Sequence, residues 1–166
     1  MEESATYYDS PIGRIKITAD GSAVTSINFV EDGAPQAEVR TSPVLEQCAG
    51  QLREYFDGRR SAFTFPTAQQ GTDFQQRAWR ELAKIPYGAT ITYGEQAARL
   101  GNAKAMRAVG AANGKNNLSI AVPCHRVVGK SGALVGYAQG LWRKQWLLQH
   151  EKSTRQGKKI TASGSK

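Results

Sequence analysis

The chain has 166 residues, 40% of them hydrophobic, which suits one domain or two small ones with a buried core. It contains no apolar run of membrane-spanning length, and two isolated cysteines with two histidines provide neither a disulfide framework nor an evident zinc site. The acidic start Met-Glu-Glu-Ser lacks the basic and apolar regions of a signal peptide, so we expect a cytoplasmic protein that carries no secretion signal.

The formal net charge of +8 is distributed unevenly along the chain. Residues 1–74 hold 6 Lys and Arg against 11 Asp and Glu, residues 75–151 hold 11 against 3, and residues 152–166 hold 5 basic residues and no acid. A basic region can bind a polyanion, because Lys and Arg release counterions from phosphates, or it can simply keep a surface soluble. We favour a nucleic-acid surface, because the basic half also contains a helix-turn-helix pattern.

The first part of the chain predicts a small α+β domain. Strands are expected over residues 6–9, 14–19 and 23–30, separated by the turn sequences Ser10-Pro-Ile-Gly13 and Asp20-Gly21. Ser42-Pro43 then starts a helix with the apolar residues Leu45, Cys48, Ala49, Leu52, Tyr55 and Phe56 on one face. Cys48 is therefore expected in the core, and residues 63–65 predict one more short strand.

Two short helices joined by a Gly-Asn turn form the helix-turn-helix pattern. Thr92 can cap the first helix, and Glu95 three residues later completes a capping box. Gly101 ends this helix, and Asn102 is expected to cap a second one that extends from residue 103 to about 113. The second helix of such a pair commonly enters a DNA groove, but an ordinary helical hairpin has the same pattern, and the pattern alone leaves both open.

The segment Pro123-Cys-His-Arg-Val127 contains a candidate nucleophile. A neighbouring imidazolium or guanidinium can lower the pKa of a thiol and favour the reactive thiolate. A free cysteine is often a small buried hydrophobic residue instead, and Ile120-Ala-Val122 predicts a buried strand. Adjacent side chains on a strand point to opposite faces, so His125 needs a turn or a bridging water to act on Cys124.

The segment Ile120-Ala-Val-Pro-Cys-His-Arg-Val-Val-Gly129 closely resembles the active-site segment of the O6-alkylguanine-DNA alkyltransferases, also called methylated-DNA–protein-cysteine methyltransferases. Further segments resemble the same family in the same order: residues 71–79, 85–88, 92–95, 108–113 and 146–151. The similarity is dense from Gly71 to Glu151 and sparse before that.

The resemblance implies an α+β fold. An N-terminal RNase H-like domain of sheet and helix, residues 1–66, would support a mostly helical C-terminal domain, residues 74–152, that contains the helix-turn-helix, binds DNA and transfers the alkyl group. A linker over residues 67–73 would join them. The basic residues 153–166 are expected to form a disordered tail.

The resemblance further implies DNA repair by direct reversal. Cys124 would attack the alkyl carbon on O6 of guanine, and we expect O4-alkylthymine as a second substrate. The thioether product is not readily reversed, so each molecule would act once. No metal, nucleotide or methyl donor would be needed, in line with the lack of a P-loop or a dinucleotide fingerprint in the sequence. The expected partner is double-stranded DNA containing O6-alkylguanine, bound by a monomer whose cooperative loading is left open, and no membrane.

The resemblance also assigns catalytic residues. His125 would activate Cys124 through a water molecule, Glu151 would orient His125, and Asn116 would brace the turns around the site. Tyr93 would help to rotate the target nucleotide and donate a hydrogen bond to the departing guanine. Without the resemblance, Glu151 would be a surface acid, Asn116 a loop residue and Tyr93 a half-buried core residue.

The second helix of the helix-turn-helix would bind the minor groove. Its small residues allow a close approach of the backbone, and Arg107 would take the place of the nucleotide that is flipped out of the duplex. Without the resemblance, Arg107 would be a solvated helix residue. Further DNA contacts are expected from Tyr93, Lys104, Ala105, Met106 and Gly110. Met106 stands where relatives commonly carry a small residue, and it could contact the groove or fill core space.

The glycine-punctuated segment 135–140 resembles a wall of the alkyl pocket, which is expected to involve Pro123, Val135, Tyr137, Ala138 and Gln139. Ala138 and Gln139 depart from the Tyr-Ser-Gly-Gly of many relatives by removing a hydroxyl and adding bulk, so we expect poorer tolerance of large O6 groups. An amphipathic helix should follow, with Leu141, Trp142, Trp146 and Leu148 on its apolar face.

Two other classes of function remain in view. A noncatalytic DNA-binding module of similar shape would be expected to lack the cysteine. A Cys-His hydrolase would not explain the helix-turn-helix or the basic half of the chain. Alkyl transfer accounts for all of these features together.

Overall fold

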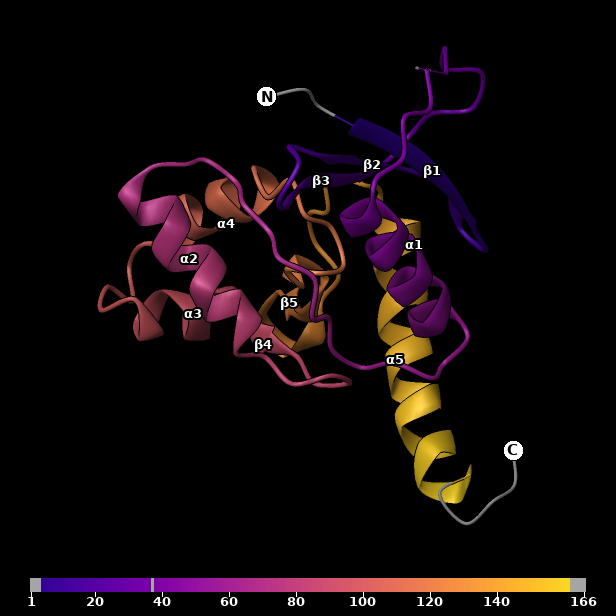
Figure 1. Ribbon diagram of the computed structural model, residues 1–166. Helices are drawn as coiled ribbons and strands as arrows, with labels where there is room; N and C mark the ends of the chain where they lie inside the picture. Colours follow the sequence, from indigo (N-terminus) through magenta and orange to yellow (C-terminus); the bar gives the residue numbers. More distant parts are fainter. Residues whose placement is uncertain (1–3, 37, 162–166) are drawn as a thin grey trace. The chain divides into compact units, whose positions relative to one another are not determined.

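The structure of the protein is a computed structural model, shown in Figure 1. It describes residues 4–36 and 38–161, of which residues 155–161 are described by their backbone alone. The chain forms two compact units: residues 1–69 with 117–121, and residues 70–116 with 122–166. The short segment 117–121 therefore belongs with the first unit, although the sequence placed it in the C-terminal domain. None of the helices in the described ranges is long and apolar enough to cross a membrane.

The first unit contains an antiparallel three-stranded sheet in the order β1-β2-β3. Its strands are β1 (Ser4–Ser10), β2 (Gly13–Ala19) and β3 (Val24–Phe29), which confirms the three predicted strands. In the turn after β1 the hydroxyl of Ser10 accepts a hydrogen bond from the backbone N–H of Ile12, and Gly13 has φ 125°, a value that favours glycine. Ile15 and Ile17 of β2 are fully buried and form the centre of this core.

Helix α1 (Pro43–Phe56) packs against this sheet, as Figure 1 shows. Ser42 caps the helix by accepting a hydrogen bond from the backbone N–H of Leu45, and Pro43 occupies the first turn. The predicted apolar face is confirmed for its buried members Leu45, Cys48, Leu52, Tyr55 and Phe56. Burial raises the pKa of the Cys48 thiol to about 12, so this cysteine is an unreactive core residue, as expected.

Residues 63–65 do not form the predicted strand. The side chain of Gln51 accepts a hydrogen bond from the backbone N–H of Thr64 at 2.9 Å and donates one to the Thr64 hydroxyl at 2.6 Å. This backbone donor is thus satisfied by a side chain and not by a neighbouring strand. The flanking Phe63 and Phe65 rings pack 5.6 Å apart, so the aromatic residues contribute to packing but not to a sheet.

The predicted strand over residues 120–122 is also wrong, because these residues form a turn. This segment pairs with β3 around Leu118, where the backbone of Ile27 bonds the carbonyl of Asn117 at 2.7 Å and the N–H of Ser119 at 3.1 Å. Ile120 then adopts φ 73°, a left-handed conformation that is unusual for a β-branched residue. The chain therefore turns immediately before the segment that contains Cys124.

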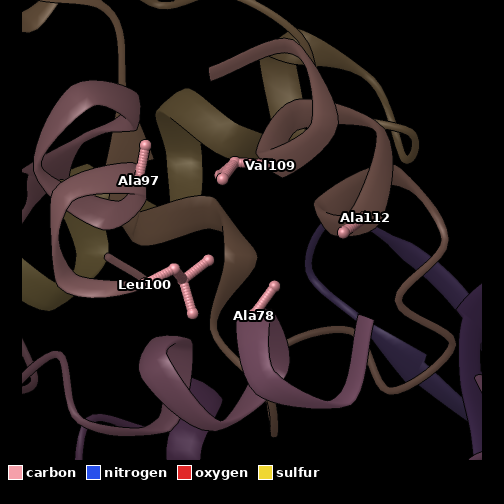
Figure 2. Packing of buried hydrophobic residues seen from close by; sticks show 5 residues of the cluster. All are labelled: Ala78, Ala97, Leu100, Val109 and Ala112. Carbon is pink, nitrogen blue, oxygen red and sulfur yellow. The ribbon is translucent and has the colours of Figure 1, made fainter. Parts of the chain in front are cut away.

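The second unit is mostly helical, and its described residues contain one two-stranded parallel sheet, β4 (Ile91–Thr92) with β5 (Val127–Val128). Its helices are α2 (Asp73–Ala83), α3 (Tyr93–Arg99), α4 (Met106–Gly114) and α5 (Leu141–Thr161), with two short 3-10 helices, η1 (Cys124–Arg126) and η2 (Lys130–Gly132). Helices α2, α3 and α4 meet around the apolar cluster of Figure 2, formed by Ala78, Ala97, Leu100, Val109 and Ala112. The structure therefore confirms the predicted fold class of a sheet-and-helix part followed by a mostly helical part.

Helices α3 and α4 form the predicted helix-turn-helix, with one difference. The capping box of α3 is present: Glu95 N–H donates to the Thr92 hydroxyl at 3.0 Å, and the Glu95 carboxylate accepts from Thr92 N–H at 2.8 Å. Asn102 does not cap α4, which begins at Met106. The Asn102 side chain accepts from Lys104 N–H and its carbonyl accepts from Ala105 N–H, so these groups close a turn instead of a helix.

Helix α5 is amphipathic as predicted, but its buried face is a different one. Leu141 and Trp142 are 45% and 56% exposed, whereas Lys144, Leu147 and Glu151 are fully buried. Two polar residues occupy the inner face because each has hydrogen-bonding partners there. The helix also continues to Thr161, so residues 153–161 are not the expected disordered tail, and residues 162–166 lie outside the described part of the chain.

Replacing Thr92 with Ala should lower the free energy of unfolding by about 1 kcal/mol, because α3 loses the cap that satisfies its first backbone donors. Urea unfolding would measure the change. Thr90→Ala is the matched control, because Thr90 is exposed two residues earlier, and it should change stability by less than about 0.5 kcal/mol. Equal losses in the two variants would show that the capping box contributes nothing particular.

Candidate active site

Cys124 is the first residue of the 3-10 helix η1, directly after the buried residue Pro123. The turn is closed by hydrogen bonds from Cys124 N–H to the Val122 carbonyl at 2.8 Å and from Arg126 N–H to the Pro123 carbonyl at 3.0 Å. The sequence required a turn for the two neighbouring side chains to act together, and η1 is such a turn. Cys124 is partly exposed, whereas His125 is fully buried behind it.

The Cys124 side chain opens into a pocket of about 430 Å³. Helix residues form part of the pocket wall, and the loop before α5 forms another part; the lining residues are Tyr93, Gly110, Asn113, Gly114, Cys124, Val135, Gly136, Tyr137 and Ala138. Three of the predicted pocket residues, Val135, Tyr137 and Ala138, line it together with Cys124. The other two, Pro123 and Gln139, are not among the lining residues, and the sequence did not predict Asn113.

Behind the pocket, one buried carboxylate joins two side chains of η1. Oε2 of Glu151 lies 2.6 Å from Nε2 of His125, and Arg126 binds the same carboxylate through Nε at 2.8 Å and Nη2 at 3.1 Å. The backbone N–H of Gly88 also donates to Oε1 of Glu151. The structure thus brings His125 and Glu151 together although 25 residues separate them. The sequence suggested Arg126 only as a cation beside the thiol and did not predict that it binds Glu151.

The charges of this cluster leave the imidazole neutral. Burial alone would raise the pKa of Glu151, but His125 and Arg126 outweigh it and hold that pKa well below its usual range. Burial lowers the pKa of His125, and the adjacent carboxylate only partly opposes this. Neutral His125 therefore donates its Nε2 proton to Glu151, which leaves Nδ1 as an acceptor. Nδ1 is buried and has no hydrogen-bond partner among the described residues, so it is available as a base.

The Cys124 thiol needs such a base. Burial raises the pKa of this thiol, and a hydrogen bond from Asn116 and the positive charge of Lys144 only partly offset the effect. The Asn116 amide lies 3.4 Å from Sγ of Cys124 and donates to the Val122 carbonyl at 2.8 Å, which links the sulfur to the turn before it. At neutral pH the sulfur is thus a thiol that must lose its proton before it can react.

Lys144 is a further site residue that the sequence did not predict. Its ammonium group is fully buried and donates to the carbonyls of Val135 and Gly136 at 3.1 and 3.0 Å. It also lies 5.6 Å from the ring of Tyr93, whose hydroxyl donates to the same Val135 carbonyl at 3.0 Å. Burial lowers the pKa of Lys144 to about 8, although nearby Cys124 raises it. Lys144 precedes Leu147 by three residues and Glu151 by seven, a spacing that places all three on one face of a helix and could have indicated that Lys144 is buried. Lysines are rarely buried, so the sequence did not suggest this.

Of the predicted DNA-binding residues, Tyr93 begins α3, and the others lie on or just before α4. Lys104, Met106 and Arg107 are exposed, whereas Ala105 and Gly110 are partly buried. Met106 is 51% exposed, so it does not fill core space. Beside it is a second hollow of about 490 Å³, lined by Thr92, Tyr93, Gly94, Met106, Arg107, Gly110, Gly129 and Lys130. Two cationic residues, Arg107 and Lys130, and three glycines thus line the same hollow. Such a surface suits a phosphate backbone.

The described ranges contain no group of three His, Cys, Asp or Glu side chains arranged to hold a metal ion. The polar side chains that act on Sγ are the Asn116 amide, at 3.4 Å, and the positively charged Lys144.

Comparisons with known proteins extend over almost the whole chain. The family model described as 6-O-methylguanine DNA methyltransferase, DNA binding domain, matches residues 73–153, and the model of the ribonuclease-like domain of the same family matches residues 4–69. A methylated-DNA–protein-cysteine methyltransferase of Methanosarcina acetivorans is 43% identical over 150 residues, which cover 88% of this chain and 96% of the relative. One of Haemophilus influenzae is 44% identical over 152 residues, or 89% of this chain and 85% of the relative.

Solved structures give the same result. The crystal structure of the O6-methylguanine methyltransferase of Mycobacterium tuberculosis matches with a TM-score of 0.82 at 42% sequence identity, over 92% of this chain and 94% of that one. The protein of the same organism in complex with DNA also matches with a TM-score of 0.82 and 42% identity, over 93% of this chain and 94% of that one. The agreement includes the N-terminal unit, for which the sequence alone offered only sparse similarity.

Replacing Lys144 with Met should raise the pKa of the Cys124 thiol, because the positive charge that favours the thiolate is removed. The rate of iodoacetamide alkylation as a function of pH measures this pKa, and the buried Cys48 does not interfere. We expect the midpoint of the profile to move to higher pH. Lys152→Met removes the same charge from an exposed position on α5 and should leave the midpoint in place. An unshifted midpoint in the Lys144 variant would contradict this role.

The stability of the protein should fall as the pH decreases from 7 to 5. The pKa of His125 is lowered in the folded state, so below its ordinary value of 6.5 the unfolded chain binds a proton that the folded chain does not. The slope contributed by one group is at most about 1.4 kcal/mol per pH unit. His125→Gln should flatten this part of the curve relative to the unaltered protein. Below about pH 4.5 the lowered pKa of Glu151 should add a second decrease. Urea unfolding at each pH gives the slopes, and an unchanged slope in His125→Gln would refute the assignment.

Proposed function

This chain belongs to the 6-O-methylguanine DNA methyltransferase family, and from that membership we propose that it repairs alkylated DNA by direct reversal, with Cys124 as the acceptor of the alkyl group. The observation that carries the proposal is the placement of Cys124. It is partly exposed in a pocket of about 430 Å³, and the next residue, His125, is a buried base held by a carboxylate. The substrate would be O6-alkylguanine in double-stranded DNA, with O4-alkylthymine as a second substrate.

His125 is the proposed general base. Its Nδ1 accepts the thiol proton through a bridging water molecule, and Glu151 stabilises the imidazolium that forms. The neutral state of His125 in the resting protein is what makes this transfer possible. Arg126 holds the Glu151 carboxylate at two points, so the carboxylate stays ionised and keeps its position while the proton moves.

The alkyl group is transferred in one displacement. The sulfur of Cys124 forms a bond to the alkyl carbon as the bond from that carbon to O6 breaks, and the electron pair of the broken bond stays on the guanine. Tyr93 lies on the pocket wall and donates a hydrogen bond to the departing base, which lowers the charge that develops there. Lys144 lowers the pKa of Cys124 and so favours the thiolate that attacks. The thioether is stable, so each protein molecule repairs one lesion.

DNA binding is assigned to the surface that contains α4. We expect one monomer to place α4 in the minor groove and Arg107 in the space left by the flipped nucleotide. Lys104, Met106 and Arg107 are exposed on this surface, while the small residues Ala105 and Gly110 allow a close approach of the backbone. Pocket and exposed surface share Tyr93 and Gly110, so a base extruded at α4 has a short path to Cys124.

Incubation with a duplex containing O6-methylguanine should add the mass of one methylene to the protein, located on Cys124 by peptide mapping. Cys124→Ser should gain no mass, and His125→Gln should react at least about 100-fold more slowly, the usual size of a general-base contribution. Cys48→Ala is the matched control and should react like the unaltered protein, because Cys48 is buried in the other unit. A duplex with unmodified guanine should add nothing.

The same experiment separates the remaining classes of function. Binding to the lesion without a change in mass would indicate a noncatalytic recognition module. Neither binding nor a mass change would favour a Cys-His hydrolase and would reject the proposal.

A further inference from the structure

Two buried side-chain amides face each other between the helices of the helix-turn-helix. Gln96 of α3 donates from Nε2 to Oδ1 of Asn113 at 3.0 Å, and Asn113 of α4 donates from Nδ2 to Oε1 of Gln96 at 2.9 Å. Gln96 is fully buried and Asn113 is 7% exposed. The pair lies beside the apolar cluster of Figure 2, and no step of the proposed reaction uses it.

The orientation of both amides is fixed by a third group that cannot rotate. Nε2 of Gln96 also donates to the backbone carbonyl of Ala78 in α2, at 3.3 Å. If Gln96 were rotated by half a turn, its oxygen would face this carbonyl oxygen, and two acceptors would oppose each other without a proton between them. Gln96 is therefore held with its nitrogen toward Ala78. Asn113 must in turn present its nitrogen to the Gln96 oxygen.

This arrangement leaves one amide proton of Asn113 unused. The Nδ2 group carries two protons, and among the described residues only Oε1 of Gln96 accepts one of them. Asn113 also lines the pocket, together with Cys124 and Tyr93. A buried donor that remains half satisfied costs free energy, so such a proton on a pocket wall indicates an acceptor that arrives with the ligand.

We propose that Asn113 donates this proton to a ring nitrogen of the damaged base in the pocket, and that Gln96 is the positioning residue that fixes the donor. The inference rests on the proposed function, because it assumes that the pocket receives the base. Alkylation at O6 removes the proton that guanine carries on N1, so an O6-alkylguanine offers N1, N3 and N7 as bare acceptors. If the acceptor is N1, a rigid donor also distinguishes the damaged base from guanine, which presents an N–H there, whereas N3 and N7 are acceptors in both bases.

The test couples a change in the protein to a change of one atom in the base. Single-turnover rates of methyl transfer are measured with duplexes containing O6-methylguanine or its 1-deaza, 3-deaza or 7-deaza analogue, each of which replaces one ring nitrogen by C–H. For the unaltered protein, one analogue should react about tenfold more slowly than the parent base, the effect of one lost hydrogen bond. In Asn113→Leu the parent base should be slowed by about the same factor, and that analogue should bring no further loss.

Gln96→Met should reduce the penalty of the same analogue, because Asn113 can then rotate and presents its donor only part of the time. Arg77→Met is the matched control. It removes another hydrogen bond between helices, from Arg77 of α2 to the Leu100 carbonyl, away from the pocket, and it should keep the full penalty. If Gln96 only stabilised the helices, Gln96→Met and Arg77→Met would show the same rate penalty for the analogue.

The outcomes separate this inference from the proposed function. If every analogue keeps its penalty in Asn113→Leu, or if Gln96→Met behaves like Arg77→Met, the inference is overturned while methyl transfer by the unaltered protein still supports the proposed function. If the unaltered protein transfers no methyl group from the parent base, both are overturned.

Discussion

The active-site half of the protein depends on one buried carboxylate. Glu151 is fully buried, and burial of an ionised group is costly unless other groups compensate its charge and satisfy its oxygens. Arg126, His125 and the N–H of Gly88 do this together, so α5, η1 and the loop before β4 are joined at a single point. Burial lowers the pKa of His125 and keeps it neutral, so Arg126 supplies the positive charge beside the carboxylate. The interaction that holds the fold together here also leaves the histidine ready to accept a proton.

Those parts of the fold that are encoded locally could be predicted from the sequence. The capping box of Thr92 and Glu95, the Ser42 cap and the three strands of the first unit need only neighbouring residues, and all are present. The failures lie where a distant group decides. The side chain of Gln51 accepts the hydrogen bond from the backbone N–H of Thr64, which a neighbouring strand would otherwise accept. The left-handed conformation of Ile120 turns the chain where a strand was expected over residues 120–122. No local pattern reports such partners.

The candidate site was predictable to the extent that it resembles a known family. That resemblance pointed to Cys124, His125 and Glu151, which the structure brings together behind and within one pocket. It did not point to Arg126, Lys144 or Asn113. Each of these is a polar side chain whose burial is explained only by its partners, and each would have been placed on the surface from its residue type alone. The reacting residues could thus be predicted from the sequence, whereas the buried polar side chains around them could not.

The carbonyl of Val135 accepts hydrogen bonds from both Tyr93 and Lys144. The loop of the pocket wall is therefore held by two independent hydrogen-bond donors. In the proposed reaction the Tyr93 hydroxyl would turn toward the bound base and give up its bond to the loop, while Lys144 would still hold the carbonyls of Val135 and Gly136. The tyrosine would then change partners without releasing the pocket wall. One hydroxyl is free to move because a neighbouring ammonium group is not.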